Sequence, residues 1–146
     1  MIDSHISDIK WMKRAIYLAS LGKGRTSPNP MVGAVILDKN GNLISEGFHS
    51  KAGMPHAEAM AFNNLKKDAR DGTIYVNLEP CCHQGKTPPC VDKIISFGIK
   101  KVFVSIEDPD KRVSGKGIKL LKDAGIKVHL GLCEKESREL NKSFIH

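Results

Sequence analysis

The apolar residues of this chain recur at helical spacing in some segments and gather in short continuous runs in others. Ile9, Met12, Ile16 and Ala19 fall on one face of a helix over residues 8–21. Short apolar runs bounded by turn residues predict buried strands. The pattern predicts helices over residues 8–21, 56–67, 90–97, 117–123 and 134–144, and strands over residues 32–37, 43–48, 74–78, 101–106 and 126–130.

The order of these elements predicts a mixed sheet. The turn sequence Asp38-Lys39-Asn40-Gly41 joins the first two strands as an antiparallel hairpin. After residue 70 strands alternate with helices, which is typical of right-handed crossovers between parallel strands. We therefore predict an α/β fold with a sheet of about five strands and helices on both of its faces.

Length and hydropathy indicate a single globular domain. The 146 residues are enough to bury a core, and no repeat or linker divides them. No apolar stretch is long enough for a transmembrane helix, and residues 1–14 lack the apolar region of a secretory signal. We expect a cytoplasmic protein with no membrane partner.

The charge balance favours an anionic partner, either a phosphorylated small molecule or a nucleic acid. The net charge is +7, from 23 Lys and Arg against 16 Asp and Glu. The lysines are scattered, and the chain has only two Tyr and one Trp, whereas a platform for single strands would use more aromatic side chains. Nucleic acid is therefore the less favoured partner.

The segments His56-Ala57-Glu58 and Pro80-Cys81, together with Cys90, contain the parts of a hydrolytic zinc site. Zinc binds Cys sulfur and His nitrogen, and three protein ligands leave a fourth position open for water. Glu58 lies two residues from the histidine, where it could carry a proton. An H-x-E sequence followed by P-C and a further cysteine is the signature of zinc-dependent base deaminases.

A closed, structural zinc module is the alternative that the cysteines leave open. It would need a fourth ligand from Cys82 or Cys133. Cys82 is adjacent to Cys81, which makes tetrahedral ligation by both awkward, and Cys133 is remote in sequence. In such a module Glu58 would have no role.

Several longer motifs surround the zinc-site residues. They are Pro28-Asn29-Pro30-Met31-Val32-Gly33, Gly47-Phe48-His49, Gly53-Met54-Pro55-His56-Ala57-Glu58, Leu78-Glu79-Pro80-Cys81-Cys82-His83-Gln84-Gly85-Lys86-Thr87-Pro88-Pro89-Cys90 and Asp108-Pro109. Through these motifs the chain, from about residue 8 onward, resembles the pyrimidine deaminase of riboflavin biosynthesis, the N-terminal half of a bifunctional deaminase-reductase family. The eight residues 82–89 between the two cysteines are specific to this resemblance, because generic base deaminases have a shorter segment there.

The resemblance implies a fold, a reaction and a set of site residues. The fold is the three-layer α/β/α sandwich of cytidine deaminases. One Zn²⁺ per chain is held by His56, Cys81 and Cys90, and Glu58 is the proton shuttle. The enzyme is then a hydrolase that converts 2,5-diamino-6-ribosylamino-4(3H)-pyrimidinone 5′-phosphate to 5-amino-6-ribosylaminouracil 5′-phosphate and ammonia. The residues that match substrate-pocket positions are Asn29, His49, His83, Lys86, Asp108 and Asp110.

Two other functions compete with this interpretation: a tRNA or nucleoside base deaminase of the same superfamily, and a non-catalytic zinc module. The family normally continues into a reductase domain after a segment like Leu140-Asn141-Lys142-Ser143-Phe144. We therefore expect residues 1–146 to form a zinc-dependent deaminase domain without a reductase. A homo-oligomer and a separate reductase remain open as partners.

Lys86 tests the expected phosphate contact. Lys86→Ala should raise KM more for the phosphorylated substrate than for its dephosphorylated form, because a point charge facing the phosphate is removed. Steady-state ammonia release from both compounds measures the difference. Equal increases in KM would remove the phosphate assignment.

Overall fold

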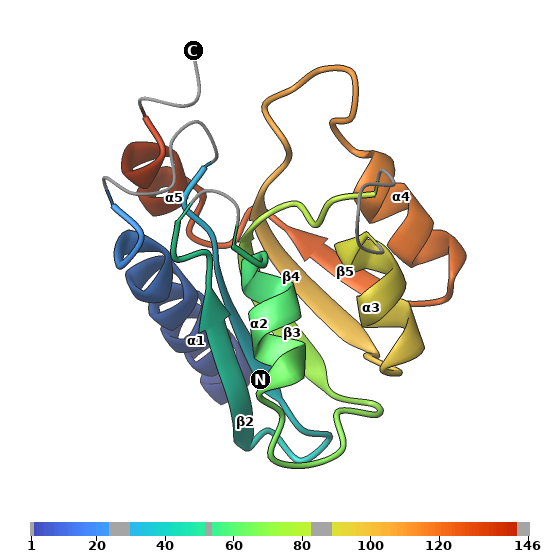
Figure 1. Ribbon diagram of the computed structural model, residues 1–146. Helices are drawn as coiled ribbons and strands as arrows, with labels where there is room; N and C mark the ends of the chain where they lie inside the picture. The colour runs from blue at the N-terminus through green and yellow to red at the C-terminus, as the bar shows by residue number, and fades with distance from the viewer. Residues whose placement is uncertain (1, 24–29, 52–53, 83–88, 143–146) are drawn as a thin grey trace.

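The computed structural model describes residues 2–23, 30–51, 54–82 and 89–142, with the side chains of residues 2–5 excepted (Figure 1). Its elements, in chain order, are α1 (Ile2–Ser20), β1 (Gly33–Leu37), β2 (Leu43–Phe48), α2 (Ala57–Asn63), β3 (Thr73–Leu78), α3 (Cys90–Ser96), β4 (Lys101–Ile106), α4 (Lys116–Asp123), β5 (Lys127–Leu130) and α5 (Glu134–Leu140). None of the described helices combines the length and the apolar character needed to cross a membrane.

The five strands form one mixed sheet in the order β2-β1-β3-β4-β5. β1 is antiparallel to both of its neighbours, whereas β3, β4 and β5 are parallel to one another. The predicted hairpin and the predicted parallel crossovers are therefore confirmed. The carboxyl ends of β3 and β4 lie together at one edge of the sheet, since Leu78 pairs with Ile106.

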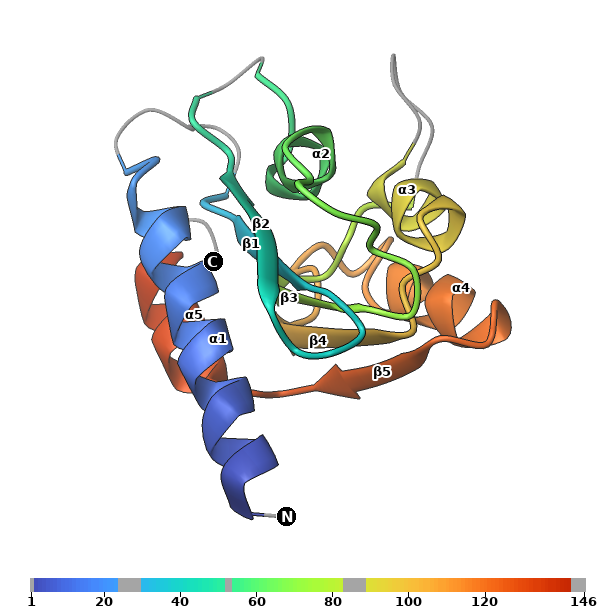
Figure 2. The same cartoon turned by 90° about the horizontal axis from the view of Figure 1, so that it is seen from below.

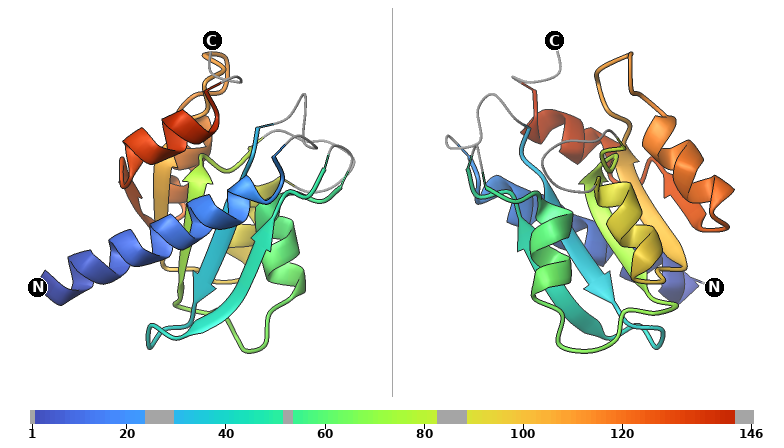
Figure 3. Two further views of the ribbon diagram at one scale, coloured as in Figure 1. Left: turned by 90° about the vertical axis from the view of Figure 1, so that its left-hand side faces the viewer. Right: turned by 45° about the vertical axis from the view of Figure 1, so that its right-hand side comes forward.

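Helices cover both faces of the sheet and make a three-layer α/β/α sandwich, as expected. Figure 2 shows α1 and α5 on one side of the strands and α2, α3 and α4 on the other, and Figure 3 shows α1 and α5 side by side. Every residue of β1 is buried, as expected for a strand covered on both faces. Along β3, Ile74 and Val76 pack in the cluster under α2 and α3, and Tyr75 packs against α1.

Three helix boundaries differ from the predicted ones by more than one residue. α5 ends at Leu140 rather than at residue 144, and Asn141 and Lys142 already form a turn. α1 begins at Ile2 rather than Asp8; Ile2 and Ile6 continue the helical spacing of Ile9 toward the N-terminus, so the apolar pattern extends beyond the predicted start. α2 ends at Asn63 rather than Lys67. Beyond its end the chain turns back to the sheet, where the Lys66 N–H donates to the Ile44 carbonyl at 3.3 Å. A tertiary hydrogen bond therefore replaces the next helical turn.

Gly47 allows the backbone of β2 to contact the backbone of α2 directly. A Cβ at this position would lie 2.5 Å from the Ala57 carbonyl oxygen and 2.6 Å from the Ala61 nitrogen. No side chain larger than hydrogen fits without a backbone shift. This close approach fixes the first turn of α2, and with it His56, against the sheet.

Gly47→Ala should therefore lower the free energy of unfolding by about 1–3 kcal/mol, the usual cost of overpacking a core. Urea denaturation of the wild type and the variant measures this loss. Gly41→Asn is the matched control: Gly41 has a φ of 86°, which asparagine tolerates, and no atom lies within 4 Å of the place that a Cβ would take there. A Gly47→Ala variant as stable as this control would contradict the close-packing account.

Candidate metal centre

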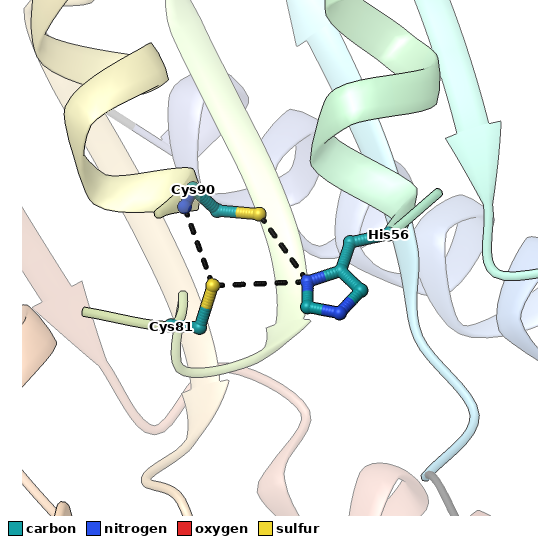
Figure 4. A group of neighbouring side chains, drawn as sticks. All are labelled: His56, Cys81 and Cys90. Carbon is teal, nitrogen blue, oxygen red and sulfur yellow. Dashed lines mark hydrogen bonds between the residues drawn. The ribbon is translucent and has the colours of Figure 1, made fainter. Parts of the chain in front are cut away.

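Three potential metal ligands from three separate elements meet at the carboxyl end of β3. His56 is the residue before α2, Cys81 follows β3, and Cys90 is the first residue of α3. Figure 4 shows their side chains directed toward one another. Nδ1 of His56 lies 3.7 Å from Sγ of Cys81 and 3.5 Å from Sγ of Cys90, and the potential ligand atoms all lie within 4.8 Å of one another.

This donor set fits a single zinc ion. Zn–S bonds of about 2.3 Å and Zn–N bonds of about 2.0 Å in a tetrahedron place neighbouring ligand atoms about 3.5–3.8 Å apart. The two distances from His56 Nδ1 to the sulfurs agree with that spacing. Two sulfurs and one imidazole nitrogen are also the donor types that zinc prefers.

The polar contacts of the cluster stabilise a thiolate at Cys81. The Cys90 thiol and the Cys90 backbone N–H, which is 3.3 Å from Sγ, both donate to Cys81 and lower the pKa of its thiol to about 4. A hydrogen bond with Cys81 raises the pKa of His56. A second hydrogen bond, between Cys81 and Cys90, acts together with burial to raise the pKa of the Cys90 thiol. Because metal ligands must be deprotonated, metal binding at this cluster would release protons.

Glu58 lies in the first turn of α2, and its side chain is buried in the same cavity as His56 and Cys81. Burial, reinforced by the neighbouring Cys81, raises the pKa of its carboxyl to about 7. A carboxyl with a pKa near neutrality can both accept and donate a proton at physiological pH. Glu58 is therefore suited to general acid/base chemistry beside the ligand cluster.

The cavity beside the ligands is lined by Pro30, Val32, His49, His56, Ala57, Glu58, Leu78, Glu79, Cys81 and Asp108. Two of the expected substrate residues, His49 and Asp108, are among them. His49 is buried, its Nδ1 lies 3.1 Å from the Pro55 carbonyl oxygen, and its ring meets that of His56 edge to face with centroids 5.8 Å apart.

Among the other expected substrate residues, Asp110 belongs to the described part of the chain, and it does not line this cavity. Asp110 forms an ion pair with Arg112 at 2.8 Å, and the hydrogen bonds from Arg112 lower the pKa of the Asp110 carboxyl to about 2. Its side chain is thus engaged outside the cavity lining. Asn29, His83 and Lys86 lie outside the described residues.

Neither of the remaining cysteines belongs to the ligand cluster among the described residues. Cys82 packs against the apolar cluster under α2 and α3, and Cys133 packs against the cluster under α1, on the other face of the sheet. Among the described residues, two cysteines and one histidine therefore give a set of three ligands rather than a closed cage of four. An open position is the hallmark of a catalytic zinc site.

Glu79 organises the part of the cavity wall that Asp108 lines, a role that the sequence did not reveal. It is buried; its Oε1 accepts hydrogen bonds from the N–H groups of Asp108 and Gly115, each at 2.9 Å, and its Oε2 accepts one from Ile118 at 3.1 Å. These bonds hold the segment after β4 against the end of β3. The only available signal was an ionisable residue at the end of a buried strand, directly before Pro80-Cys81.

Comparison with protein families finds one matching family over most of the chain. Residues 5–106 match the family described as "Cytidine and deoxycytidylate deaminase zinc-binding region". The match includes the H-x-E segment and both cysteines of the ligand cluster.

Named relatives agree with this match. The chain is 52% identical over 137 residues to riboflavin biosynthesis protein RibD of Aquifex aeolicus, covering 94% of this chain and 38% of that protein. It thus spans well under half of the length of this relative. It is 50% identical over 139 residues to diaminohydroxyphosphoribosylamino-pyrimidine deaminase of Buchnera aphidicola, covering 95% of this chain and 94% of that protein.

Solved structures give the same picture of the fold. RibD of Acinetobacter baumannii superposes with a TM-score of 0.93 at 46% identity, over 97% of this chain and 40% of that one. The deaminase/reductase of Thermotoga maritima also gives a TM-score of 0.93, at 47% identity, over 97% of this chain and 41% of that one. The three-layer sandwich is therefore the deaminase fold.

Cys90→Ser should reduce the zinc content of the purified protein from one per chain to well below one, because a ligand thiolate is lost. Cys82→Ser, which changes the neighbouring cysteine outside the cluster, should keep one zinc. Metal analysis by plasma mass spectrometry distinguishes the two variants. Full zinc in Cys90→Ser, or loss of zinc in Cys82→Ser, would overturn the ligand assignment.

Proposed function

The chain belongs to the cytidine and deoxycytidylate deaminase zinc-binding family, and we propose that it deaminates 2,5-diamino-6-ribosylamino-4(3H)-pyrimidinone 5′-phosphate in riboflavin biosynthesis. One water is consumed, and 5-amino-6-ribosylaminouracil 5′-phosphate and ammonia are formed. The observation that carries the proposal is the cluster of His56, Cys81 and Cys90 in one cavity with the buried Glu58. The names of the relatives from Aquifex and Buchnera support the choice of substrate.

We assign His56, Cys81 and Cys90 as the ligands of one Zn²⁺ per chain. When bound there, zinc would acidify a water molecule so that hydroxide is available near neutral pH. The protein residues prepare this position by holding two sulfurs and one nitrogen at the spacing of a tetrahedral site.

Glu58 is proposed to move the protons of the reaction. Its carboxylate accepts a proton from the attacking water and delivers it to the pyrimidine ring nitrogen. It then takes the second proton, from the hydroxyl that has been added to the ring carbon, and delivers it to the amino group, so that the C–N bond breaks, ammonia leaves and a carbonyl remains. Burial supports this role, because it raises the pKa of Glu58 to about 7 and so makes both protonation states accessible near neutral pH. The apolar residues Val32, Ala57 and Leu78 line the same cavity and limit the access of other water molecules to Glu58.

The pocket residues are proposed to orient the pyrimidine and its phosphate. A carbonyl oxygen only accepts, so Nδ1 of His49 carries the proton in its contact with Pro55, and the neutral ring then has Nε2 as an acceptor. Asp108 offers its carboxylate oxygens as acceptors in the same cavity. Asn29, His83 and Lys86 complete the proposed contacts, with Lys86 facing the phosphate. Asp110, whose carboxylate is paired with Arg112, contributes through its backbone N–H, which donates to Asp108 Oδ1 at 2.9 Å.

We further propose that residues 1–146 act as one zinc-dependent deaminase domain, partnered by a second copy or by a separate reductase. A single sheet with a core on each face supports the assignment of one domain. A cytoplasmic setting suits a site whose two cysteines must stay reduced to bind metal.

Ammonia release from the proposed substrate tests the function. Glu58→Gln should keep one zinc per chain and its fold but lose about a hundred- to ten-thousand-fold in kcat, because an amide cannot carry the proton. Glu134→Gln, an exposed residue of α5 paired with Arg138, is the matched control and should retain the wild-type rate. Undiminished turnover in Glu58→Gln would refute the proton-shuttle role, and a wild-type protein that binds zinc but releases no ammonia would refute the proposed reaction.

A further inference from the structure

The backbone of Met31 is held by the side chains of two asparagines that are far apart in the sequence. Asn141, directly after α5, accepts the Met31 N–H at its Oδ1 at 2.8 Å and donates from its Nδ2 to the Met31 carbonyl at 2.9 Å. Asn77 of β3 donates from its Nδ2 to the same carbonyl at 3.1 Å and accepts the Gly33 N–H at its Oδ1 at 2.8 Å. These hydrogen bonds together fix the backbone from Met31 to Gly33.

Both asparagines are almost completely buried, Asn77 being 0% and Asn141 2% exposed. Each uses its oxygen as an acceptor and its nitrogen as a donor, so neither amide can be rotated or replaced by a carboxylate without losing a contact. A buried polar group left without a partner costs more than an ordinary hydrogen bond contributes. The two side chains therefore specify one position of Met31.

The segment held in this way is a wall of the candidate active site. Pro30 and Val32, the two neighbours of Met31, line the cavity that contains His56 and Glu58. The Val32 carbonyl also accepts the backbone N–H of His49 at 3.0 Å. The position of Met31 thereby determines where Pro30 and Val32 lie in the cavity wall. Through the Val32 carbonyl it also determines the position of the His49 backbone.

The support that Asn141 gives to this wall comes from outside the elements that carry the metal ligands. The ligand cluster rests on α2, α3 and the end of β3, whereas α5 packs on β4 and α1, on the opposite face of the sheet (Figure 2). The hydrogen bonds of Asn141 to Met31 therefore link the α5 layer to the pocket without touching a ligand.

We propose that Asn141 and Asn77 are positioning residues that hold the Pro30–Val32 wall in place for the substrate. The inference rests on the proposed function and extends it to a helix outside the metal centre. Loss of the Asn141 contacts should loosen the wall and weaken substrate binding, while the zinc ligands and Glu58 stay in place. KM should therefore rise by about five- to tenfold, and kcat should change by less than about twofold.

The test compares Asn141→Ala and Asn141→Asp with Ser137→Ala in the intact chain. Asn141→Asp keeps the shape of the side chain and the acceptor toward the Met31 N–H but loses the donor toward the carbonyl. Ser137 is the matched control, since its buried hydroxyl donates to Ser105 Oγ at 2.7 Å and anchors α5 to β4 one helical turn earlier, without contacting Met31. Each variant is measured for zinc content, thermal midpoint, kcat and KM with the diaminopyrimidinone ribosyl phosphate, and hydrogen exchange of the Met31 amide.

The proposal predicts that both Asn141 variants keep their zinc, raise KM and exchange the Met31 amide faster, while Ser137→Ala lowers the thermal midpoint but leaves KM unchanged. If Asn141→Ala does not fold, the Asn141→Asp variant carries the comparison. Equal KM values for the Asn141 variants and Ser137→Ala would overturn the positioning role and leave the proposed function standing. Absence of turnover in the wild type would instead overturn the proposed function, and the positioning role with it.

Discussion

The meeting of two sulfurs and one imidazole nitrogen at the end of β3 is the constraint on which the rest of this structure depends. Atoms that share one ion must come within a few ångströms of one another, so the elements that carry them must end at the same point. His56, Cys81 and Cys90 satisfy this requirement because α2 and α3 both begin where β3 ends. The positive ends of helices also favour the thiolate form of cysteine at such a point.

Buried polar side chains at the end of β3 form hydrogen bonds that hold the backbone segments around the metal site in place. Asn77 holds the segment before β1, and Glu79 holds the segment after β4. Among the described residues, every buried side-chain nitrogen or oxygen has a hydrogen-bond partner. The chain at the end of β3 thus supplies the metal ligand Cys81. Two residues apart in the same stretch, Asn77 and Glu79 support the two segments that flank the site. Preorganisation of this kind lets a site hold its geometry before any substrate arrives.

The sequence was most informative where a residue type has few alternative uses. The spacing of His56, Glu58, Cys81 and Cys90 indicated one site because each of these residues has a chemical role in zinc-dependent hydrolysis. Short apolar runs likewise indicated the positions of the strands. The predicted start of α1 at Asp8 is too late, although Ile2 and Ile6 continue the helical spacing of Ile9 and so carry the periodic signal. The end of α2 was missed because a hydrogen bond from Lys66 to Ile44 depends on tertiary structure. The supporting roles of Asn77 and Asn141 were also out of reach, since their contacts with Met31, which span 46 and 110 positions, leave no local pattern.

Zinc-edge X-ray absorption of the purified protein tests the central claim, an open site with one imidazole and two cysteine ligands. Such a site predicts two sulfur ligands at about 2.3 Å and two lighter ligands at about 2.0–2.1 Å, one of the latter being exchangeable solvent. A shell of three or more sulfurs would contradict the claim, because Cys82 or Cys133 would then close the site and leave no position for a reacting water.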